Sequence, residues 1–196
     1  MRVALITVTL AAALLAPAVA APLPGLLPAG TFEIVPGDSS AAFFVPDNRG
    51  GFSGKTTRIS GRVTVVQADD AYVAQVAAAI DAGSLTTQIG LRDAAMRSTY
   101  LRTDRFPVIA FAGTASARPG LALKPFSAAI RGRLTLRDVT REEQFSATVT
   151  ALSHEYLADV TTSIKMADYG IPYPRAFIFV ARDPVTITLH IVARQP

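Results

Sequence analysis

The amino-acid sequence predicts an all-β protein, a sandwich or a barrel. Apolar and polar residues alternate with a period of two in several segments, which is typical of strands that bury one face. Short turn signals separate these segments, as they do in sandwiches and barrels. The chain has no cysteine, so its stability must come from packing and not from disulfide bonds.

The first twenty residues predict a cleavable export signal. One arginine precedes an apolar stretch over residues 3–16, and small residues follow up to Ala20, which is the layout of a secretory signal. The stretch is short for a helix that spans a bilayer, which needs about 20 apolar residues, so an uncleaved anchor is the weaker alternative. We therefore expect cleavage after Ala20, a proline- and glycine-rich leader over residues 21–30, one domain over residues 31–196, and a periplasmic or secreted protein.

The alternation predicts strands in the following order along the chain: TFEIV, RISGRVTV, IRGRLTL, FSATVTAL, AFIFVA and PVTITLHIVA. RISGRVTV and IRGRLTL share the pattern I-x-G-R-x-T, although one repeat does not prove a duplication. In three of the segments, one face carries only apolar or small residues and the other carries Arg, Ser, Thr or His. The members of the apolar faces are Ile59, Gly61, Val63, Val65, Ile130, Gly132, Leu134, Leu136, Val185, Ile187, Leu189 and Ile191.

Two segments have helical character instead. In AYVAQVAAAIDAG, Val76 and Ile80 belong to a helical spacing and alanine is frequent, so the residues alone predict a helix. LRDAAMRS predicts a short helical loop near residues 90–100, and Asp93 and Arg97 form an i,i+4 pair there. Pro107 then suits the beginning of a strand.

The charge balance raises two classes of partner. The chain has a net charge of +4, with sixteen arginines and only three lysines. A basic chain can bind nucleic acid, but export argues against that partner. A GC-rich genome accounts for the arginine excess without any function, and attraction of an anionic ligand or lipid surface is the alternative.

The titratable residues do not predict an enzyme or a metal site. The two histidines are separated: His190 lies on the polar face of its strand, and His154 lies next to Glu155. Adjacent carboxylates at 69–70 and 142–143 suit solvated turns, and neighbours in a strand would point to opposite faces. A zinc site needs more cysteine and histidine ligands than the sequence offers, and no glycine-rich phosphate loop is present.

Five segments, taken together and in order, resemble the YceI-like family of exported lipid-binding proteins. The most specific are LRDAAMRSTYLRTDRFPVIAF, similar to the family's R-D-x-x-L-R-S…F-P-x-I-x-F block, and RGRLTLRDVTREEQF, similar to its G-x-L-T-x-x-G-V-T-R segment. TFEIVPGDSSAAFFV, SIKMADYGI and DPVTITLHIVA add weaker support. The chain departs from the family at Asp38, where a histidine is frequent, and at Asp138-Val139-Thr140, where the family has a glycine.

The resemblance implies an extended, lipocalin-like antiparallel β-barrel of about eight strands that holds an isoprenoid, quinone-like or other amphipathic lipid. It also implies a strand over residues 73–80, which we favour over the helix because tertiary context overrides propensity. Burial of a lipid chain in an apolar lumen is worth about 0.8 kcal/mol per CH₂ group. We expect no enzyme activity, no cofactor and no nucleic acid partner. Transient membrane contact and a homodimer stay open.

The candidate ligand-binding residues form two groups. The lumen candidates are phenylalanines, with plain core packing as the alternative for each: Phe43, Phe52, Phe106, Phe111, Phe145, Phe177 and Phe179. The head-group candidates are Arg92, Asp93 and Arg97, for which the alternative is that Asp93 and Arg97 only pin the loop to the barrel wall. Three other functions stay open: a structural or partner-binding module, a lipid- or quinone-modifying enzyme, and the less favoured outer-membrane barrel.

Overall fold

The computed structural model of the protein describes residues 27–69, 71–118, 124–176 and 178–196. The predicted export signal and residues 21–26 of the predicted leader lie outside the described residues. Within the described residues, no helix is long and apolar enough to cross a membrane.

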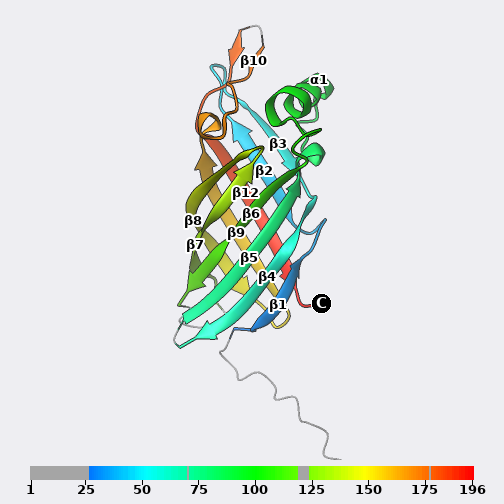
Figure 1. The fold of residues 1–196 in the computed structure, drawn as a ribbon. Coiled ribbons are helices and arrows are strands. Elements are labelled where there is room, and N and C mark those ends of the chain that lie inside the picture. Colours follow the sequence, from blue (N-terminus) through cyan, green and yellow to red (C-terminus); the bar gives the residue numbers. More distant parts are fainter. Residues whose placement is uncertain (1–26, 70, 119–123, 177) are drawn as a thin grey trace, which may run out of the picture.

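One antiparallel sheet of ten strands forms a tall barrel (Figure 1). Eight strands close the ring in the order β1-β4-β5-β6-β7-β8-β9-β12, because β1 also pairs with β12 through Glu33 and Arg194. The barrel predicted from the sequence is therefore confirmed. The strands are β1 (Gly30–Ile34), β2 (Ser40–Val45), β3 (Phe52–Thr56), β4 (Ile59–Ala68), β5 (Ala71–Asp81), β6 (Val108–Ala117), β7 (Phe126–Leu136), β8 (Val139–Ala151), β9 (Glu155–Ile164) and β12 (Val185–Arg194).

The two remaining strands of the sheet, β2 and β3, extend one end of the barrel. β2 pairs with the first half of β12, next to the place where β1 pairs with its second half. β3 pairs with β2, and an isolated β-bridge between Lys55 and Thr86 joins β3 to the loop after β5. The pairs β1–β4 and β2–β3 therefore lie beside different halves of β12. β2, β3 and the loop after β5 form the wall beside the first half of β12.

β5 is a strand along its whole length, so the helix suggested by the local residues is wrong and the strand implied by the family resemblance is right. Residues 71–81 pair with β4 on one side and with β6 on the other. Two complete backbone ladders outweigh the helix propensity of alanine, which is less than 1 kcal/mol per residue relative to strand-forming residues. The small alanine side chains also leave space inside the barrel.

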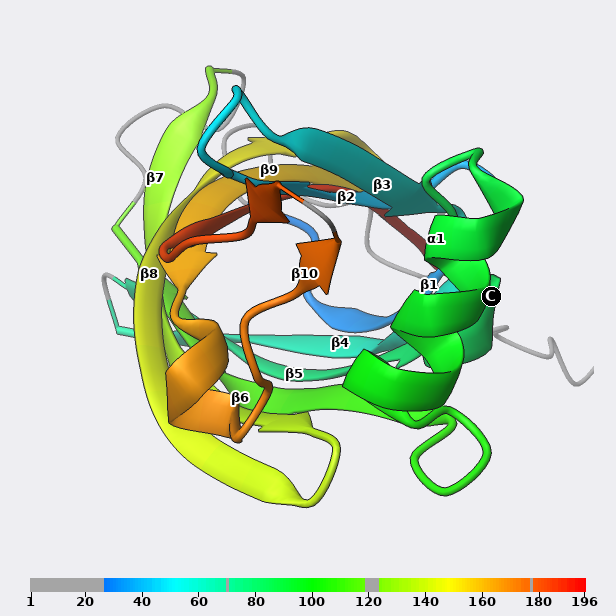
Figure 2. The ribbon, with the colours of Figure 1, turned by 90° about the horizontal axis from the view of Figure 1, so that it is seen from above.

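The helical loop predicted near residues 90–100 is confirmed. It comprises η1 (Ala82–Ser84), α1 (Gly90–Ala95) and the π-helical turn η2 (Met96–Leu101). β6 begins at Val108, directly after Pro107, as the position of the proline predicts. α1 and η2 stand at the same end of the barrel as β2 and β3 (Figures 1 and 2).

AFIFVA does not form a barrel strand, and this prediction is wrong. The segment after η3 (Met166–Tyr169) instead forms a small hairpin of β10 (Arg175–Ala176) and β11 (Phe179–Val180), which pair only with each other. Prolines at 172, 174 and 184 flank the hairpin. Proline cannot donate a ladder hydrogen bond, so it separates this segment from the strands on either side.

Glycines permit tight strand contact inside the barrel. Gly61 has φ +150°, and a Cβ atom there would lie 2.1 Å from the carbonyl oxygen of Ala77 on β5. Gly113 and Gly132 face each other on β6 and β7, and a Cβ on Gly132 would also meet the Phe111 ring at 2.7 Å. The shared I-x-G-R-x-T pattern therefore marks two places where neighbouring strands approach too closely for a side chain in place of the glycine.

Two apolar clusters lie at opposite ends of the barrel, which we call the base and the mouth. The base cluster contains Leu27, Phe32, Tyr72 and Tyr156. Leu27 is 5% exposed and Gly30 pairs with Val65, so residues 27–30 are part of the barrel and not of a loose leader. The mouth cluster includes the buried side chains of η3 and packs against Tyr100 and Leu101 of η2. Its members are Val45, Leu136, Met166, Tyr169, Ile171, Ala181 and Val185.

Candidate binding cavity

A cavity of about 930 Å³ occupies the barrel between the base and the mouth. The inward faces of the strands line it, so the apolar side chains point inward as the alternation predicts. The ten non-glycine members of the predicted apolar faces of β4, β7 and β12 all line the cavity. The lumen is therefore hollow, which the sequence pattern could not distinguish from a filled core.

Four of the predicted phenylalanines line the cavity as two pairs. Phe111 of β6 and Phe145 of β8 have ring centroids 5.5 Å apart. Phe43 of β2 and Phe52 of β3 meet edge to face, with centroids 6.4 Å apart. Aromatic rings in these arrangements stabilise one another while their free faces remain in the lumen.

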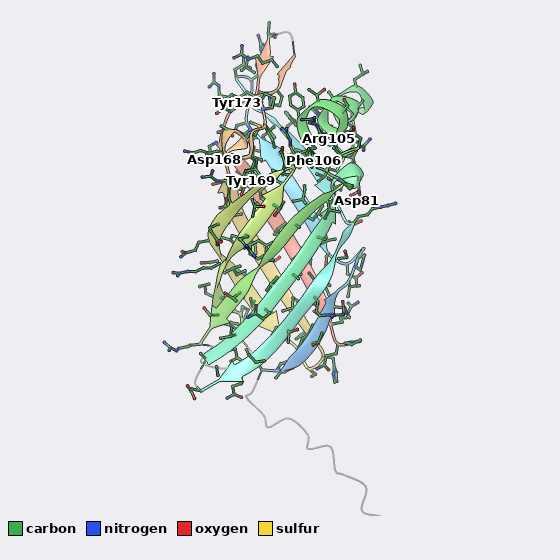
Figure 3. The ribbon with its side chains drawn as sticks, in the orientation of Figure 1. Asp81, Arg105, Phe106, Asp168, Tyr169 and Tyr173 are labelled. Atoms are coloured by element: carbon green, nitrogen blue, oxygen red, sulfur yellow. The ribbon has the colours of Figure 1, made fainter. Side chains whose placement is uncertain are left out.

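Of the other three predicted phenylalanines, one lies outside the cavity, and the side chains of the other two are not described. Phe106 does not line the cavity. Its ring centre lies 5.9 Å from the guanidinium of Arg102 and 5.3 Å from that of Arg105. Figure 3 shows Phe106 beside Arg105. It precedes β6, so the inward alternation that places Phe111 in the lumen does not extend to it. Phe177 lies outside the described residues, and Phe179 is described only by its backbone in β11.

The base of the cavity is closed by two tyrosines that sequence reasoning missed. The hydroxyl of Tyr156 donates to the carbonyl of Pro28 at 2.6 Å, and the hydroxyl of Tyr72 accepts from the N–H of Leu27 at 3.1 Å. Tyr156 also packs against Phe32 with centroids 4.9 Å apart. Burial, and then the neighbouring Tyr72, raise the pKa of Tyr156 far above its ordinary value, so the base is neutral.

Charged residues line the cavity towards the mouth. Among the described residues they are Asp47, Arg92, Glu143 and Arg175. Arg92 is held by its Nε atom, which donates to Thr87 Oγ1 at 2.9 Å, and its guanidinium lies 4.5 Å from the centre of the Phe52 ring. This predicted head-group residue is therefore placed where the cavity meets the helical loop.

Glu143 points inward from β8, which differs from the solvated turn that the sequence suggested. Glu143 lines the cavity and its neighbour Glu142 is exposed on the outer face, as residues that alternate along a strand must be. The hydroxyl of Tyr169 donates to Glu143 Oε1 at 2.6 Å, and Tyr169 is fully buried. Burial, followed by the Glu143 carboxylate, raises the pKa of Tyr169, so its hydroxyl keeps the proton that it donates.

Asp93 is buried in a hydrogen-bond network of the helical loop and does not line the cavity. It accepts from Thr86 Oγ1 at 2.6 Å, from the Thr87 N–H at 2.7 Å and from Thr87 Oγ1 at 2.5 Å. Burial alone would raise the pKa of Asp93, but these hydrogen bonds and the charge of Arg97 outweigh it and lower the pKa to about 2. The loop is thus built around a carboxylate that is ionised at neutral pH.

Arg97 ties the same loop to the chain before it. Its Nη2 atom donates to the carbonyl of Leu85 at 3.0 Å, and its side chain does not line the cavity. Arg137, in the turn between β7 and β8, donates to the carbonyl of Gly170 at 2.9 Å and so joins that turn to η3. For Asp93 and Arg97, the structure matches the alternative in which they pin the loop, whereas Arg92 stays a head-group candidate.

The histidines lie away from the cavity. His190 Nδ1 is 2.7 Å from Asp159 Oδ1, and His154 Nδ1 is 3.1 Å from Gln195 Oε1, both on the outer surface. Within the described residues, no three acidic or histidine side chains gather in a group that could hold a metal ion.

Comparisons with known proteins identify the family and show which solved structures share the fold. The family model of the YceI-like domain matches residues 32–193. The barrel is similar to that of BcnA from Burkholderia cenocepacia, with a TM-score of 0.68 and 16% identity, over 81% of this chain and 98% of that one. A search of curated proteins finds no match.

Two further solved structures share the fold. One is described as a polyisoprenoid binding domain from Saccharophagus degradans implicated in plant cell wall breakdown; its TM-score is 0.68 at 16% identity, over 86% of this chain and 100% of that one. The other is the YceI protein of Campylobacter jejuni, with a TM-score of 0.55 at 12% identity, over 73% of this chain and 84% of that one. At these identities the likeness establishes a common fold.

Proposed function

Because the chain belongs to the YceI-like domain family, we propose that it binds an isoprenoid or another amphipathic lipid inside its barrel. The observation that carries this proposal is the apolar cavity of about 930 Å³. That volume lies near the upper limit of small-molecule sites, which span about 300 to 1,000 Å³. The description of the Saccharophagus degradans domain as polyisoprenoid binding supports the same class of ligand.

The shape of the barrel supports a long, thin ligand. β8 has 13 residues, and a strand of that length extends about 40 Å at roughly 3.3 Å per residue. Barrel strands tilt by about 35–45° from the barrel axis, so β8 spans about 30 Å of the barrel's height. The cavity wall is built mostly from alanine, valine, leucine and isoleucine. Ten methylene groups removed from water would contribute about 8 kcal/mol before the costs of association, so a hydrocarbon tail can dominate the affinity.

The polarity of the cavity supports one orientation for that ligand. The base is neutral, and the charged lining residues Asp47, Arg92, Glu143 and Arg175 gather towards the mouth. A polar head group placed at the mouth can form charge-assisted hydrogen bonds and keep contact with water, whereas at the base it would lose its hydration. We therefore place the head group near Arg92 and the end of the tail near the base tyrosines.

We further propose that the protein acts as a carrier or a sequestering protein in the periplasm or outside the cell. The predicted export signal at residues 1–20 supports that location. We propose binding without turnover as its activity, because an apolar lumen with a polar mouth suffices to hold a lipid.

The proposal is tested by native mass spectrometry of the protein purified from its own cells without detergent, followed by solvent extraction of the bound molecule. We expect a complex heavier than the polypeptide by the mass of one lipid, and an extract that contains a long hydrocarbon chain with a polar head. A folded protein that carries no added mass, and that takes up no prenol or quinone when these are supplied, would refute the proposal.

A further inference from the structure

Four large apolar side chains are exposed at the mouth of the barrel. Leu91 on α1 is 89% exposed and Ile89 just before it is 52% exposed. On the segment that carries the β10–β11 hairpin, Ile178 is 57% exposed and Tyr173 is 42% exposed. Side chains of this size are costly to leave in water when they gather at one end of a molecule.

These residues belong to two separate segments that flank one opening. α1 stands on one side of the ring, and the β10–β11 hairpin stands nearer to its middle (Figure 2). Tyr173 lies above Tyr169, towards the end of the molecule that carries the hairpin (Figure 3). Ile89 and Leu91 also line the cavity, beside Arg92, so the exposed apolar surface adjoins the lining of the lumen.

The mouth end of the protein also carries more cations than anions. The segments there, residues 46–55, 81–107, 137–143 and 165–183, contain eleven lysines and arginines against nine aspartates and glutamates. The remainder of the chain after the predicted signal contains seven of the former and six of the latter. Arg49, Arg175 and Arg182 are all exposed among these cations, so the rim combines apolar tips with basic side chains.

We propose that the mouth docks on an anionic phospholipid bilayer, with Leu91 and Ile178 inserted among the acyl chains and the rim arginines on the lipid phosphates. This inference rests on the proposed lipid-binding function and adds the place from which the ligand is taken. A bilayer matches both the exposed apolar side chains and the basic side chains of the rim, because its hydrocarbon core lies beneath an anionic surface. A lipid that moves along Leu91 and Ile89 into the cavity would not have to cross water.

The test is sedimentation with lipid vesicles. The exported protein is mixed with vesicles of phosphatidylcholine alone, or with about one-third phosphatidylglycerol, at low ionic strength and then at high salt. We expect binding to the anionic vesicles and its loss at high salt, because the Debye length shortens from about 10 Å at 0.1 M to about 3 Å at 1 M. Ile178→Glu and Arg182→Glu, neither of which lines the cavity, should each weaken vesicle binding about tenfold.

Matched controls come from the other parts of the barrel. Leu152, in the turn between β8 and β9, is 44% exposed, and Arg131 is exposed on the outer face of β7. Leu152→Glu and Arg131→Glu should leave vesicle binding unchanged, and the lipid content measured by native mass spectrometry should be the same in all four variants. Equal losses in the mouth variants and the control variants would overturn the inference.

The inference and the proposed function fail in different ways. A wild-type protein that carries lipid but does not bind anionic vesicles would overturn the docking and leave the rim to another occupant, such as a protein. A wild-type protein that carries no lipid and takes none up would refute the proposed function itself, and the docking inference with it.

Discussion

The two ends of this barrel use aromatic residues in opposite ways. At the base, the hydroxyls of Tyr72 and Tyr156 form hydrogen bonds with backbone groups of residues 27–28, and the tyrosine rings pack in the base cluster. At the mouth, the Phe52 ring lies under the Arg92 guanidinium and remains part of the cavity wall. The base is therefore a sealed core, while the mouth keeps polar and apolar groups available.

This difference separates the residues that stabilise the barrel from those to which the proposed function assigns contact with a ligand. The helical loop contains both kinds within six residues: Asp93 and Arg97 are engaged with the loop itself, and Arg92 faces the cavity. Substitutions at the base and in the loop network should therefore change stability, whereas substitutions in the lumen should also change binding. The size of each effect tests this separation of stabilising residues from ligand-binding residues.

The largest effect is expected in the wall between the two ends. Phe111→Arg would place a charge in an apolar cavity beside Phe145, at a cost of several kcal/mol, so the protein should either fail to fold or lose its lipid. The adjacent Ala112 is exposed on the outer face, which makes Ala112→Arg the matched control. Thermal unfolding and native mass spectrometry measure both outcomes. Unchanged stability and lipid content in the Phe111 variant would show that this wall does not contact the ligand.

The next effect concerns the loop network at the mouth. The pKa of Asp93 is about 2 when folded, below its ordinary value of 3.8, and this difference contributes about 2 kcal/mol of stability. Because the folded pKa is lowered, that stability is present above about pH 4 and is lost as the pH falls through 2. Asp93→Asn should therefore lower the melting temperature at pH 7 by about 4–8 °C, and the difference from wild type should shrink in acid.

The control for this prediction is Asp104→Asn, which changes an exposed carboxylate of the same segment and should leave the melting temperature within about 1 °C. The Asp93 variant should bind headed lipids as tightly as the wild-type protein does, and the same should hold for bare hydrocarbon chains, because Asp93 does not line the cavity. A selective loss of affinity for headed lipids would instead assign Asp93 to the head group.

A smaller effect, on binding and not on stability, is expected at Arg92. Arg92→Ala removes a guanidinium from the mouth of the cavity, so lipids with a polar head should bind up to about tenfold more weakly. A bare hydrocarbon chain of the same length should bind unchanged, and the melting temperature should stay close to that of the wild type. Calorimetric titration with a prenol and with the matching hydrocarbon makes the comparison. An equal loss for both ligands would mean that Arg92 acts only by packing on Phe52.

The smallest effect is expected at the base. Tyr156→Phe removes one buried hydrogen bond to Pro28 and keeps the ring that packs on Phe32, which should cost about 1 kcal/mol of stability. Lipid affinity should not change, since the proposed position of the head group is at the other end. The free energy of unfolding in urea gives the first quantity and titration gives the second. A strong loss of lipid binding would contradict the neutral, closed base.

Most of the barrel could be predicted from the sequence because its strands alternate strictly. Ile59, Val63 and Val65, and the matching residues of β7 and β12, all line the lumen as expected. β5 could not be predicted from its own residues, because its strand form depends on ladders with β4 and β6 that are distant in sequence. Only the family resemblance supplied it.

The cavity was harder to predict than its walls. Phe43, Phe52, Phe111 and Phe145 were placed correctly in the lumen, but Phe106 was not, because alternation has no meaning outside a strand. Glu143 was missed since adjacent glutamates suggest a turn, and Tyr72 and Tyr156 were missed since their partners are backbone groups of residues 27–28. The burial of Asp93 depends on Thr86 and Thr87, whose hydroxyls give no directional signal in sequence.

The central claim, a lipid in the lumen with its head at the mouth, can be tested most directly by fluorescence quenching. The chain has no tryptophan, so Phe126→Trp near the base and Phe52→Trp at the mouth each introduce a single reporter that replaces a lining side chain. A lipid brominated at the end of its tail should quench the Phe126→Trp protein strongly and the Phe52→Trp protein weakly. The reverse order, or equal quenching of both, would contradict the account.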